Sequence, residues 1–479
     1  MVFNSAQFFL FFLAVAAVYF LCPLRWRWTV LLAASIVFYG WAKPVYLVLL
    51  AATVTSTWYA GQLMDRSATM QRRRTIMQMT LLLNLLILVV FKYLGFFNEL
   101  IGLFTHSAPG KLPFSFPVLL LPIGISFYTF QSIGYVLDVY FKVRKPEPHF
   151  GYYSVFVSFF PQILSGPIGR STELLPQIRN QRKSRWEDIE SGISRFSWGI
   201  FKKMVIADRL SLIVDDVYAN PSAHQGMVFW FVTVLYAFQL YADFSGYTDM
   251  AIGVARIFGI RLAENFDFPY ISKNVTEFWR RWHLSLSNWL RDYLYTPIMF
   301  SKKKWGKKAV MYAIVLTFLI CGIWHGARLT FVIFGVLQAG ALLWEMRSRE
   351  LRARWSRSLP KTAYGFFSWL LTFLFVVFCF IFFRADTTKD ALLIVKREFT
   401  GFTDLGDFRA FLAHLNYSRI AFTLFCCLVF FIIDKPVSLL IRNEAAEKSR
   451  QRAMLAGAFI ALTLALGVFG KADFIYFKF

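Results

Sequence analysis

The chain is a series of long apolar blocks separated by short clusters of polar and basic residues. A helix needs about 20 mostly apolar residues to cross a bilayer. Blocks that approach this length lie at 6–24, 28–42, 44–63, 77–97, 116–140, 193–217, 227–250, 309–325, 329–346, 363–384, 420–441 and 453–470. The pattern therefore predicts an all-α polytopic membrane protein with about 11–13 transmembrane helices. The first block lacks a signal-peptide cleavage pattern and is interpreted as a retained span.

Clusters of Lys and Arg between the blocks predict the orientation of the spans. Positive residues concentrate in cytoplasmic loops. The clusters are Arg25 and Arg27, Arg66–Arg74, Lys142–Lys145, Lys302–Lys308, Arg347–Lys361 and Arg442–Arg452. If all of them are cytoplasmic, the N-terminus and the loops 98–115, 218–226 and 385–419 are extracytoplasmic.

One short apolar stretch, 150–168, does not fit this scheme as a span. It lies between Lys145 and the basic stretch 179–185, so a single crossing would invert every later span. It is also too short to cross twice. Pro161, Gly166 and Pro167 interrupt it, and non-helical backbone at membrane depth is tolerated only inside protein or beside water. We expect a re-entrant or in-plane segment at the wall of a cavity.

Composition narrows the possible classes of protein. Of the 479 residues, 57% are hydrophobic, 19% aromatic and 17% charged, and the formal net charge is +24. Because the bases lie between apolar blocks, we interpret them as membrane-flanking loops and not as a nucleic-acid surface. The five cysteines form no CxxC pair. No metal site, Walker loop, HExxH motif or dinucleotide fingerprint is present in a suitable context.

The region 262–308 combines aromatic and charged residues and resembles no span. Trp279, Trp282, Leu286 and Trp289 recur at helical spacing, with arginines between them. This pattern predicts an interfacial or protein-buried helix. Its aromatic residues either anchor the bundle at the membrane surface or form the wall of a site.

Two of the six histidines lie in apolar or aromatic surroundings, His283 and His325. An ionisable residue at membrane depth is a functional hypothesis by default. His325 follows an apolar span within GIWHGA, where small residues permit close approach. A neutral imidazole can accept a proton at pH 7, so His325 is a candidate general base. The alternative is a structural histidine bonded to a neighbouring carbonyl.

Asp243 and Asp249 flank Gly246 beside an apolar block. Two carboxylates six residues apart fit an ion site, a capping pair or a support for a kink. No adequate set of metal ligands lies near them, so we favour the structural interpretation.

Several motifs together are more specific than any one of them. EFWRRWHLSLSNWLRDYLYTP (277–297) and GIWHGARLTFVIFG (322–335) resemble the membrane-bound O-acyltransferase family. LPIGISFYTFQSIGYVLDVY (121–140), FPQILSGPIGR (160–170), YADFSGYTDMAIG (241–253) and the closing FIYFKF are similar to its bacterial polysaccharide-acetylating branch, which includes alginate-acetylating proteins. The resemblance covers nearly the whole chain, as one domain over 1–479 with a catalytic core at about 116–346, and it is weakest between 347 and 453.

This resemblance implies a ring of helices around a central tunnel in the bacterial inner membrane. A cytoplasmic thioester, either acetyl-coenzyme A or an acyl carrier, would supply an acyl group, most simply acetyl. The acceptor would be a hydroxyl of an extracytoplasmic polysaccharide, reached directly or through a periplasmic transferase of the SGNH type. No bound cofactor, metal or nucleic acid is implied.

The family's two histidines fall on His325, as general base, and on His283, which would orient the donor or stabilise the oxyanion. Residues expected to bind substrate or support the histidines are Trp279, Arg281, Trp282, Asn288, Asp292, Trp324 and Asp243.

Two other functions remain open at this stage. A secondary transporter would explain Asp243 and the broken segment, although two matched broken segments, as transporter repeats usually give, are not evident. A non-catalytic scaffold that anchors a partner enzyme would need neither histidine.

Overall fold

The regular structure of the protein is helical. The computed structural model describes residues 1–479 except 42, 106–121, 401–404, 444, 471–473 and 479. Parts of the predicted outer loops 98–115 and 385–419 and the start of the predicted span 116–140 therefore lie outside the described residues. Within those described there are helices and no strands, which confirms the all-α prediction.

The α-helices up to the centre of the chain are α1 (Ala6–Leu21), α2 (Arg27–Gly40), α3 (Tyr46–Asp65), α4 (Met70–Lys92), α5 (Leu94–Thr105), α6 (Ile125–Tyr140), α7 (Phe150–Ser158), α8 (Ser171–Arg179), α9 (Trp186–Phe201), α10 (Asp208–Ala219) and α11 (Met227–Ile257). Those that follow are α12 (Val275–Trp279), α13 (Leu284–Leu290), α14 (Thr296–Ser301), α15 (Lys307–His325), α16 (Leu329–Arg347), α17 (Arg349–Ser358), α18 (Lys361–Arg384), α19 (Thr388–Phe399), α20 (Leu405–His414), α21 (Tyr417–Arg442) and α22 (Ser449–Leu466). A π-helical turn, Lys202–Ala207, joins α9 to α10.

Seven helices among the described residues are long and apolar enough to cross a membrane: α3, α4, α11, α15, α16, α18 and residues 420–442 of α21. The other predicted spans also fall on helices, but α1, α2 and α6 have only 16, 14 and 16 residues. The predicted span 193–217 lies within the continuous helical run from α9 to α10.

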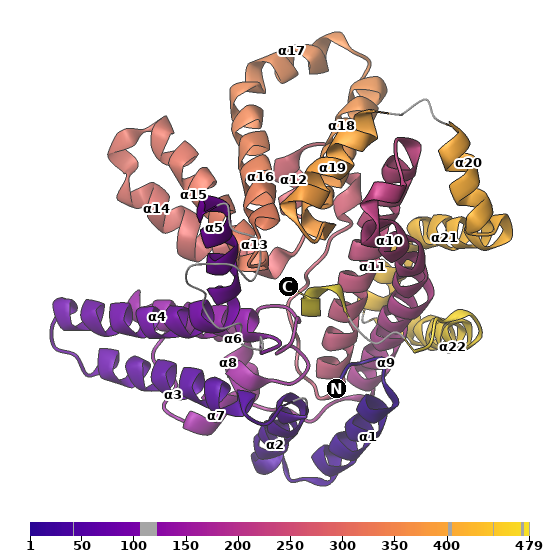
Figure 1. Ribbon diagram of the computed structural model, residues 1–479. Helices are drawn as coiled ribbons and strands as arrows, with labels where there is room; N and C mark the ends of the chain where they lie inside the picture. The colour runs from indigo at the N-terminus through magenta and orange to yellow at the C-terminus, as the bar shows by residue number, and fades with distance from the viewer. Residues whose placement is uncertain (42, 106–121, 401–404, 444, 471–473, 479) are drawn as a thin grey trace.

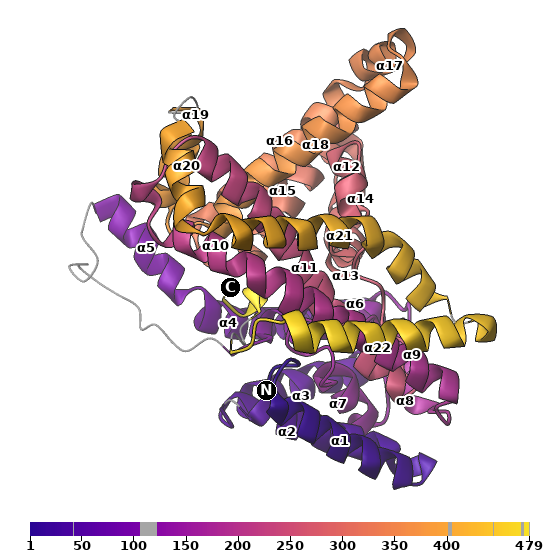
Figure 2. The same cartoon turned by 90° about the vertical axis from the view of Figure 1, so that its right-hand side faces the viewer.

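The helices surround a central region that holds the short segment Ile475–Lys478 (Figure 1). The view in Figure 2 separates α5, α19 and α20, which adjoin the predicted outer loops, from α8 and α17, which adjoin the predicted cytoplasmic clusters. The helices thus enclose a core in which distant parts of the chain meet.

Helices α9 and α11 cross at close range because glycines face each other on both. A Cβ atom added to Gly192 would lie 2.6 Å from the carbonyl oxygen of Gly253, and one added to Gly199 would lie 2.6 Å from that of Gly246. Small residues allow helix backbones to approach closely within membranes. The two glycine pairs therefore fix the position of α11 against α9.

The segment 150–170 contains the nine-residue helix α7 followed by irregular, buried backbone. Several of its polar groups are bonded inside the protein. The amide of Phe160 donates to Ser35 Oγ (3.0 Å), the carbonyl of Phe156 accepts from Gln162 (3.1 Å), and the amide of Ile168 donates to Ser285 Oγ (3.1 Å). Irregular backbone is stable at membrane depth when protein groups satisfy it in this way.

The region 262–308 departs from the prediction of one helix. The helix breaks between α12 and α13, where His283 adopts the left-handed conformation (φ 46°, ψ 55°). The side chains of Trp279, Trp282, Leu286 and Trp289 are all buried in the protein, which agrees with the protein-buried alternative. The spacing of these residues correctly predicts helical turns on either side of His283. It does not show that the backbone adopts the left-handed conformation at His283 and ends the first helix there.

Candidate active site

His325 is the last residue of α15 and lies in the buried core. Gly326, which follows it, is extended, so the helix ends at the histidine. A Cβ atom on Gly326 would overlap the ring of Phe331 on α16, which explains the small residue at this position. The backbone turn between α15 and α16 therefore holds the imidazole toward the centre of the molecule.

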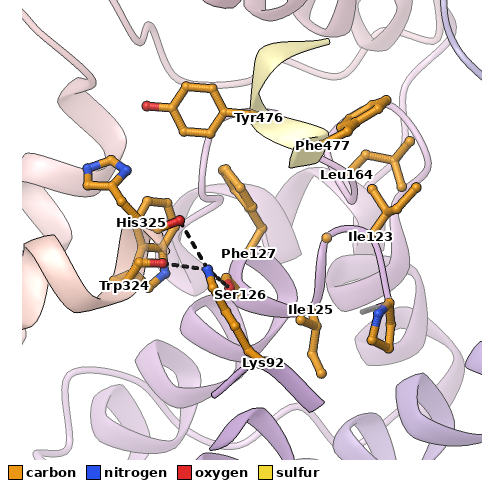
Figure 3. A pocket seen from close by; sticks show the side chains of 12 residues that line it. Lys92, Ile123, Ile125, Ser126, Phe127, Leu164, Trp324, His325, Tyr476 and Phe477 are labelled. Carbon is orange, nitrogen blue, oxygen red and sulfur yellow. Dashed lines mark hydrogen bonds between the residues drawn. The ribbon is translucent and has the colours of Figure 1, made fainter. Parts of the chain in front are cut away.

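The buried ammonium group of Lys92, at the end of α4, holds this helix end (Figure 3). Its Nζ donates to the carbonyl oxygens of Trp324 (2.6 Å) and His325 (3.3 Å) and to Ser126 Oγ (3.1 Å). The last carbonyls of a helix have no partner within the helix and carry partial negative charge. Lys92 satisfies two of these carbonyls directly beside the catalytic candidate.

His283 is fully buried and is held by Asn265, in the loop after α11. Its Nδ1 lies 3.0 Å from Asn265 Oδ1, and the backbone carbonyl of Asn265 accepts from the amide of Leu284 (2.9 Å). A left-handed conformation at a residue other than glycine persists only where the surrounding structure enforces it. Asn265 provides that constraint, because its side chain bonds to the ring of His283 and its carbonyl bonds to the next backbone amide.

The two histidines share the same aromatic walls. The ring of Trp324 lies 4.9 Å from that of His325 and 5.9 Å from that of His283, measured between ring centroids. The Tyr476 ring is 6.1 Å and 6.2 Å from the same two rings. The fold therefore places His283, 42 residues before His325, and Tyr476, 151 residues after it, around the same site.

A small cavity of about 20 Å³ lies beside His325. Its wall contains Lys92, Ser126, Phe127, Trp324 and Tyr476 (Figure 3). The cavity is partly apolar and offers an ammonium group, a hydroxyl and an imidazole at one end. Such a combination suits a ligand with one polar, reactive end.

Asp243 bonds to the backbone of the Ile475–Lys478 segment, and among the described residues it makes no hydrogen bond to either histidine. Its carboxylate pairs with Lys203 Nζ (2.6 Å) and accepts from the amide of Ile475 (2.8 Å), one residue before Tyr476. Asp249 pairs with Lys202 (3.0 Å) and Arg195 (2.8 Å). Both carboxylates are thus part of a buried ion-pair network, whereas the sequence interpretation expects a capping pair or a support for a kink.

The other predicted site residues occupy different positions. Trp279 and Trp282 pack behind the site: Trp279 Nε1 donates to Gln338 (3.0 Å), and the Trp282 ring packs on Phe266 beside Asn265. Asn288 is exposed on α13 and does not reach the site. Of the predicted supports, the structure brings only Trp324 directly against both histidines.

Arg281 and Asp292 lie away from the histidines. Arg281 pairs with Asp267 (3.0 Å) and Glu277 (3.1 Å). Asp292 pairs with Arg170 (2.7 Å), and both line a second cavity of about 500 Å³, whose wall also contains Asp138, Tyr293 and Phe300. This cavity adjoins the predicted cytoplasmic clusters at 142–145 and 302–308.

The sequence interpretation missed Asn265, Lys92 and Tyr476 as members of the site. Lys92 had a visible signal, because it is a charged residue inside an apolar block. Tyr476 lies in the closing FIYFKF motif, and Asn265 in the stretch before the histidine motif. Within the part of the chain that the structure describes, no group of three or more His, Cys, Asp or Glu side chains could hold a metal ion.

Comparison with known proteins decides the family. The model of the membrane-bound O-acyltransferase family matches residues 45–384. The chain belongs to this family. The match includes both histidines, Lys92 and Asn265, while Tyr476 lies beyond it.

Curated relatives in the family include bacterial O-acetylating proteins. The chain is 37% identical over 423 residues to a probable alginate O-acetylase of Azotobacter vinelandii, covering 88% of this chain and 81% of the relative. It is 34% identical to the probable alginate O-acetylase of Pseudomonas putida over the full length of both chains. A peptidoglycan O-acetyltransferase of Helicobacter pylori is 34% identical, with 77% of this chain and 72% of the relative covered. The protein is an O-acyltransferase of the bacterial inner membrane with several spans.

Proposed function

We propose that this O-acyltransferase moves an acetyl group from a cytoplasmic thioester to hydroxyls of an extracytoplasmic polysaccharide, with His325 as the general base. The observation that carries the proposal is the convergence of His325 and His283 on the same two aromatic rings, with a cavity beside His325, inside a membrane-embedded core. The acetylating activities in the names of the relatives support the choice of acetyl group and acceptor.

The chemistry needs a base and a fixed geometry. A hydroxyl is a weak nucleophile until a base accepts its proton. In the proposed step its oxygen attacks the thioester carbonyl, a C–O ester bond forms, and the C–S bond breaks. The imidazole of His325 takes the hydroxyl proton and returns it to the departing thiolate. Lys92 keeps the imidazole in place by holding the end of α15.

The two cavities are suited to the two substrates. The larger one contains Arg170 and adjoins the predicted cytoplasmic bases, which favour a donor that carries phosphate, such as coenzyme A or the phosphopantetheine arm of a carrier. The smaller cavity lies at the end of α4, toward the predicted outer face, and suits the acceptor hydroxyl. A periplasmic transferase that receives the acetyl group first is compatible with this arrangement.

The test is acetyl transfer from radiolabelled acetyl-coenzyme A, and from an acetyl-loaded carrier protein, in membranes that contain the protein. Because the base is lost, we expect His325→Ala to reduce labelling of polysaccharide or periplasmic protein by about 100-fold or more. His414→Ala, at an exposed histidine on α20, is the control and should label normally.

Accumulation of both variants in the membrane must be equal for the comparison to count. Normal labelling by His325→Ala would contradict the proposed role of the residue. The molecule that carries the label, polymer or protein, identifies the immediate acceptor.

A further inference from the structure

The hydrogen bonds around Asn265 determine which nitrogen of His283 carries its proton. Asn265 is fully buried, and its Oδ1 is the common partner of three groups. These are the backbone amide of Ser285 (3.1 Å), the hydroxyl of Ser285 (2.9 Å) and Nδ1 of His283 (3.0 Å).

The direction of each of these bonds follows from its neighbours. A backbone amide can only donate, so the side-chain atom that faces Ser285 N must be the oxygen of Asn265. The Ser285 hydroxyl already accepts from the amide of Ile168, which leaves its own hydrogen for the same oxygen. The amide nitrogen of Asn265 then lies on the side of Thr248 Oγ1, at 3.4 Å.

With the orientation of Asn265 fixed, Nδ1 of His283 faces an acceptor and must carry the hydrogen. A neutral imidazole has one N–H group, so Nε2 presents a lone pair. This Nε2 atom is buried and has no hydrogen-bond partner among the described residues. Its ring stands between Phe244, Trp324 and Tyr476, at the wall of the site.

We propose that Asn265 is a positioning residue that holds His283 in the Nδ1–H tautomer, so that Nε2 accepts a hydrogen bond from an O–H or N–H group of a bound substrate. The acceptor hydroxyl and the amide groups of a pantetheine arm are substrate groups of this kind. In this tautomer Nε2 of the neutral His283 carries no hydrogen, so it cannot donate a hydrogen bond to an oxyanion. Of the two roles expected from the sequence, the proposal therefore replaces stabilisation of the oxyanion with acceptance of a hydrogen bond from the substrate. The expected effect of the tautomer on the reaction rate rests on the proposed acyl transfer, whereas the tautomer itself does not.

The first test reads the tautomer directly and does not depend on activity. Nitrogen-15 NMR of histidine-labelled protein in bilayers distinguishes a protonated ring nitrogen from one with a lone pair, and subtraction of the His283→Ala spectrum isolates the signals of His283. We expect Nδ1 to be protonated and Nε2 to be unprotonated at neutral pH. A protonated Nε2 in the wild-type protein would overturn the proposal.

The second test separates positioning from simple structural support. Asn265→Ala removes the acceptor, and we expect a mixture of tautomers and a loss of kcat of about 10- to 100-fold, with a smaller change in KM. Asn265→Asp keeps an oxygen that can accept the same three bonds, so it should retain the tautomer and recover most of the rate. Asn180→Ala, at the exposed asparagine that follows α8, is the matched control and should not change either readout.

The outcomes distinguish this inference from the proposed function. Equal rates for wild type, Asn265→Ala and Asn265→Asp would contradict the positioning role. If Asn265→Ala fails to accumulate in the membrane, the wild-type spectrum and the Asn265→Asp variant still test the proposal. Loss of the Nδ1–H tautomer in Asn265→Asp would also contradict the positioning role. If the wild-type protein transfers no acyl group, the proposed function fails while the tautomer measurement remains valid.

Discussion

At the scale of the residue, the site is built from polar groups whose partners lie far away in the sequence. Lys92 bonds to carbonyls more than 230 residues later, and Asn265 bonds to a histidine 18 residues later. Each bond fixes the position of a histidine side chain or of the backbone next to it. The geometry of the candidate site therefore depends on residues that do not belong to the histidine motifs.

Replacing Lys92 should impair the reaction without preventing folding. Lys92→Met keeps the length of the side chain but leaves the carbonyls of Trp324 and His325 without their ammonium partner. A hydrogen bond to a charged group contributes about 1.5–3 kcal/mol, so we expect kcat to fall by about 10- to 100-fold. Lys92→Arg should recover part of the rate, as measured by acetyl transfer in membranes.

An exposed base on the same helix provides the control. Arg74→Met removes a positive charge from α4 at its other end and should leave the rate unchanged. Lys92→Met protein with wild-type kcat would show that the carbonyls of α15 need no such partner.

The sequence allowed some of these residues to be predicted and not others. His283 and His325 stood out because ionisable groups are costly in apolar surroundings. Asn265 and Tyr476 did not, because an asparagine in a polar loop and a tyrosine among phenylalanines carry no local signal. Asn288 follows His283 closely in the sequence, but the left-handed backbone at His283 starts a new helix that leaves Asn288 exposed.

At the scale of the element, close crossings between helices set the positions of the ion-pair network and the site. Gly246 lies where α11 meets α9, between Asp243 and Asp249 on the same helix. Lys202 and Lys203, which pair with these carboxylates, lie in the π-helical turn after α9. The glycine contact thus keeps both sides of the network within bonding distance.

A methyl group at this crossing should destabilise the protein. The Cβ atom of Gly246→Ala would lie 2.8 Å from the carbonyl oxygen of Gly199, so the helices must separate. Overpacking of this kind costs about 1–3 kcal/mol. We expect a lower midpoint of thermal unfolding in detergent for Gly246→Ala.

Gly340→Ala is the matched control, because a Cβ atom on this glycine of α16 meets no atom within 4 Å. Its unfolding midpoint should stay the same or rise, since alanine favours a helix by about 1 kcal/mol over glycine. Equal shifts in the two variants would show that the α9–α11 crossing tolerates extra volume.

The type of each structural element was easier to predict from the sequence than the residues at which it begins and ends. The apolar blocks located the helices, and the alternation of basic clusters predicts that 150–168 does not cross the membrane. The break at His283 was not predictable, because it depends on bonds from Asn265 and not on the period of Trp279, Trp282 and Trp289. The tight α9–α11 crossing likewise depends on two glycine pairs that match only in three dimensions.

At the scale of the whole molecule, two of the cavities lie in different parts of the ring of helices. The larger adjoins the predicted cytoplasmic clusters, and the smaller contains Lys92 and His325. The Ile475–Lys478 segment lies in the middle of the ring, where Asp243 holds its backbone (Figure 1). This arrangement suits a reaction whose two substrates arrive from opposite sides of the membrane.

The most direct test of this account is the sidedness of acyl transfer in sealed membrane vesicles. Inside-out and right-side-out vesicles are loaded with polysaccharide fragments, and radiolabelled acetyl-coenzyme A or acetyl-loaded carrier, neither of which crosses the membrane, is added outside. We predict that the label reaches enclosed polysaccharide, or a partner protein on that side, only in inside-out vesicles with an intact His325. Equal labelling in both orientations, or labelling confined to acceptors on the side of the donor, would contradict transfer through the histidine site across the membrane.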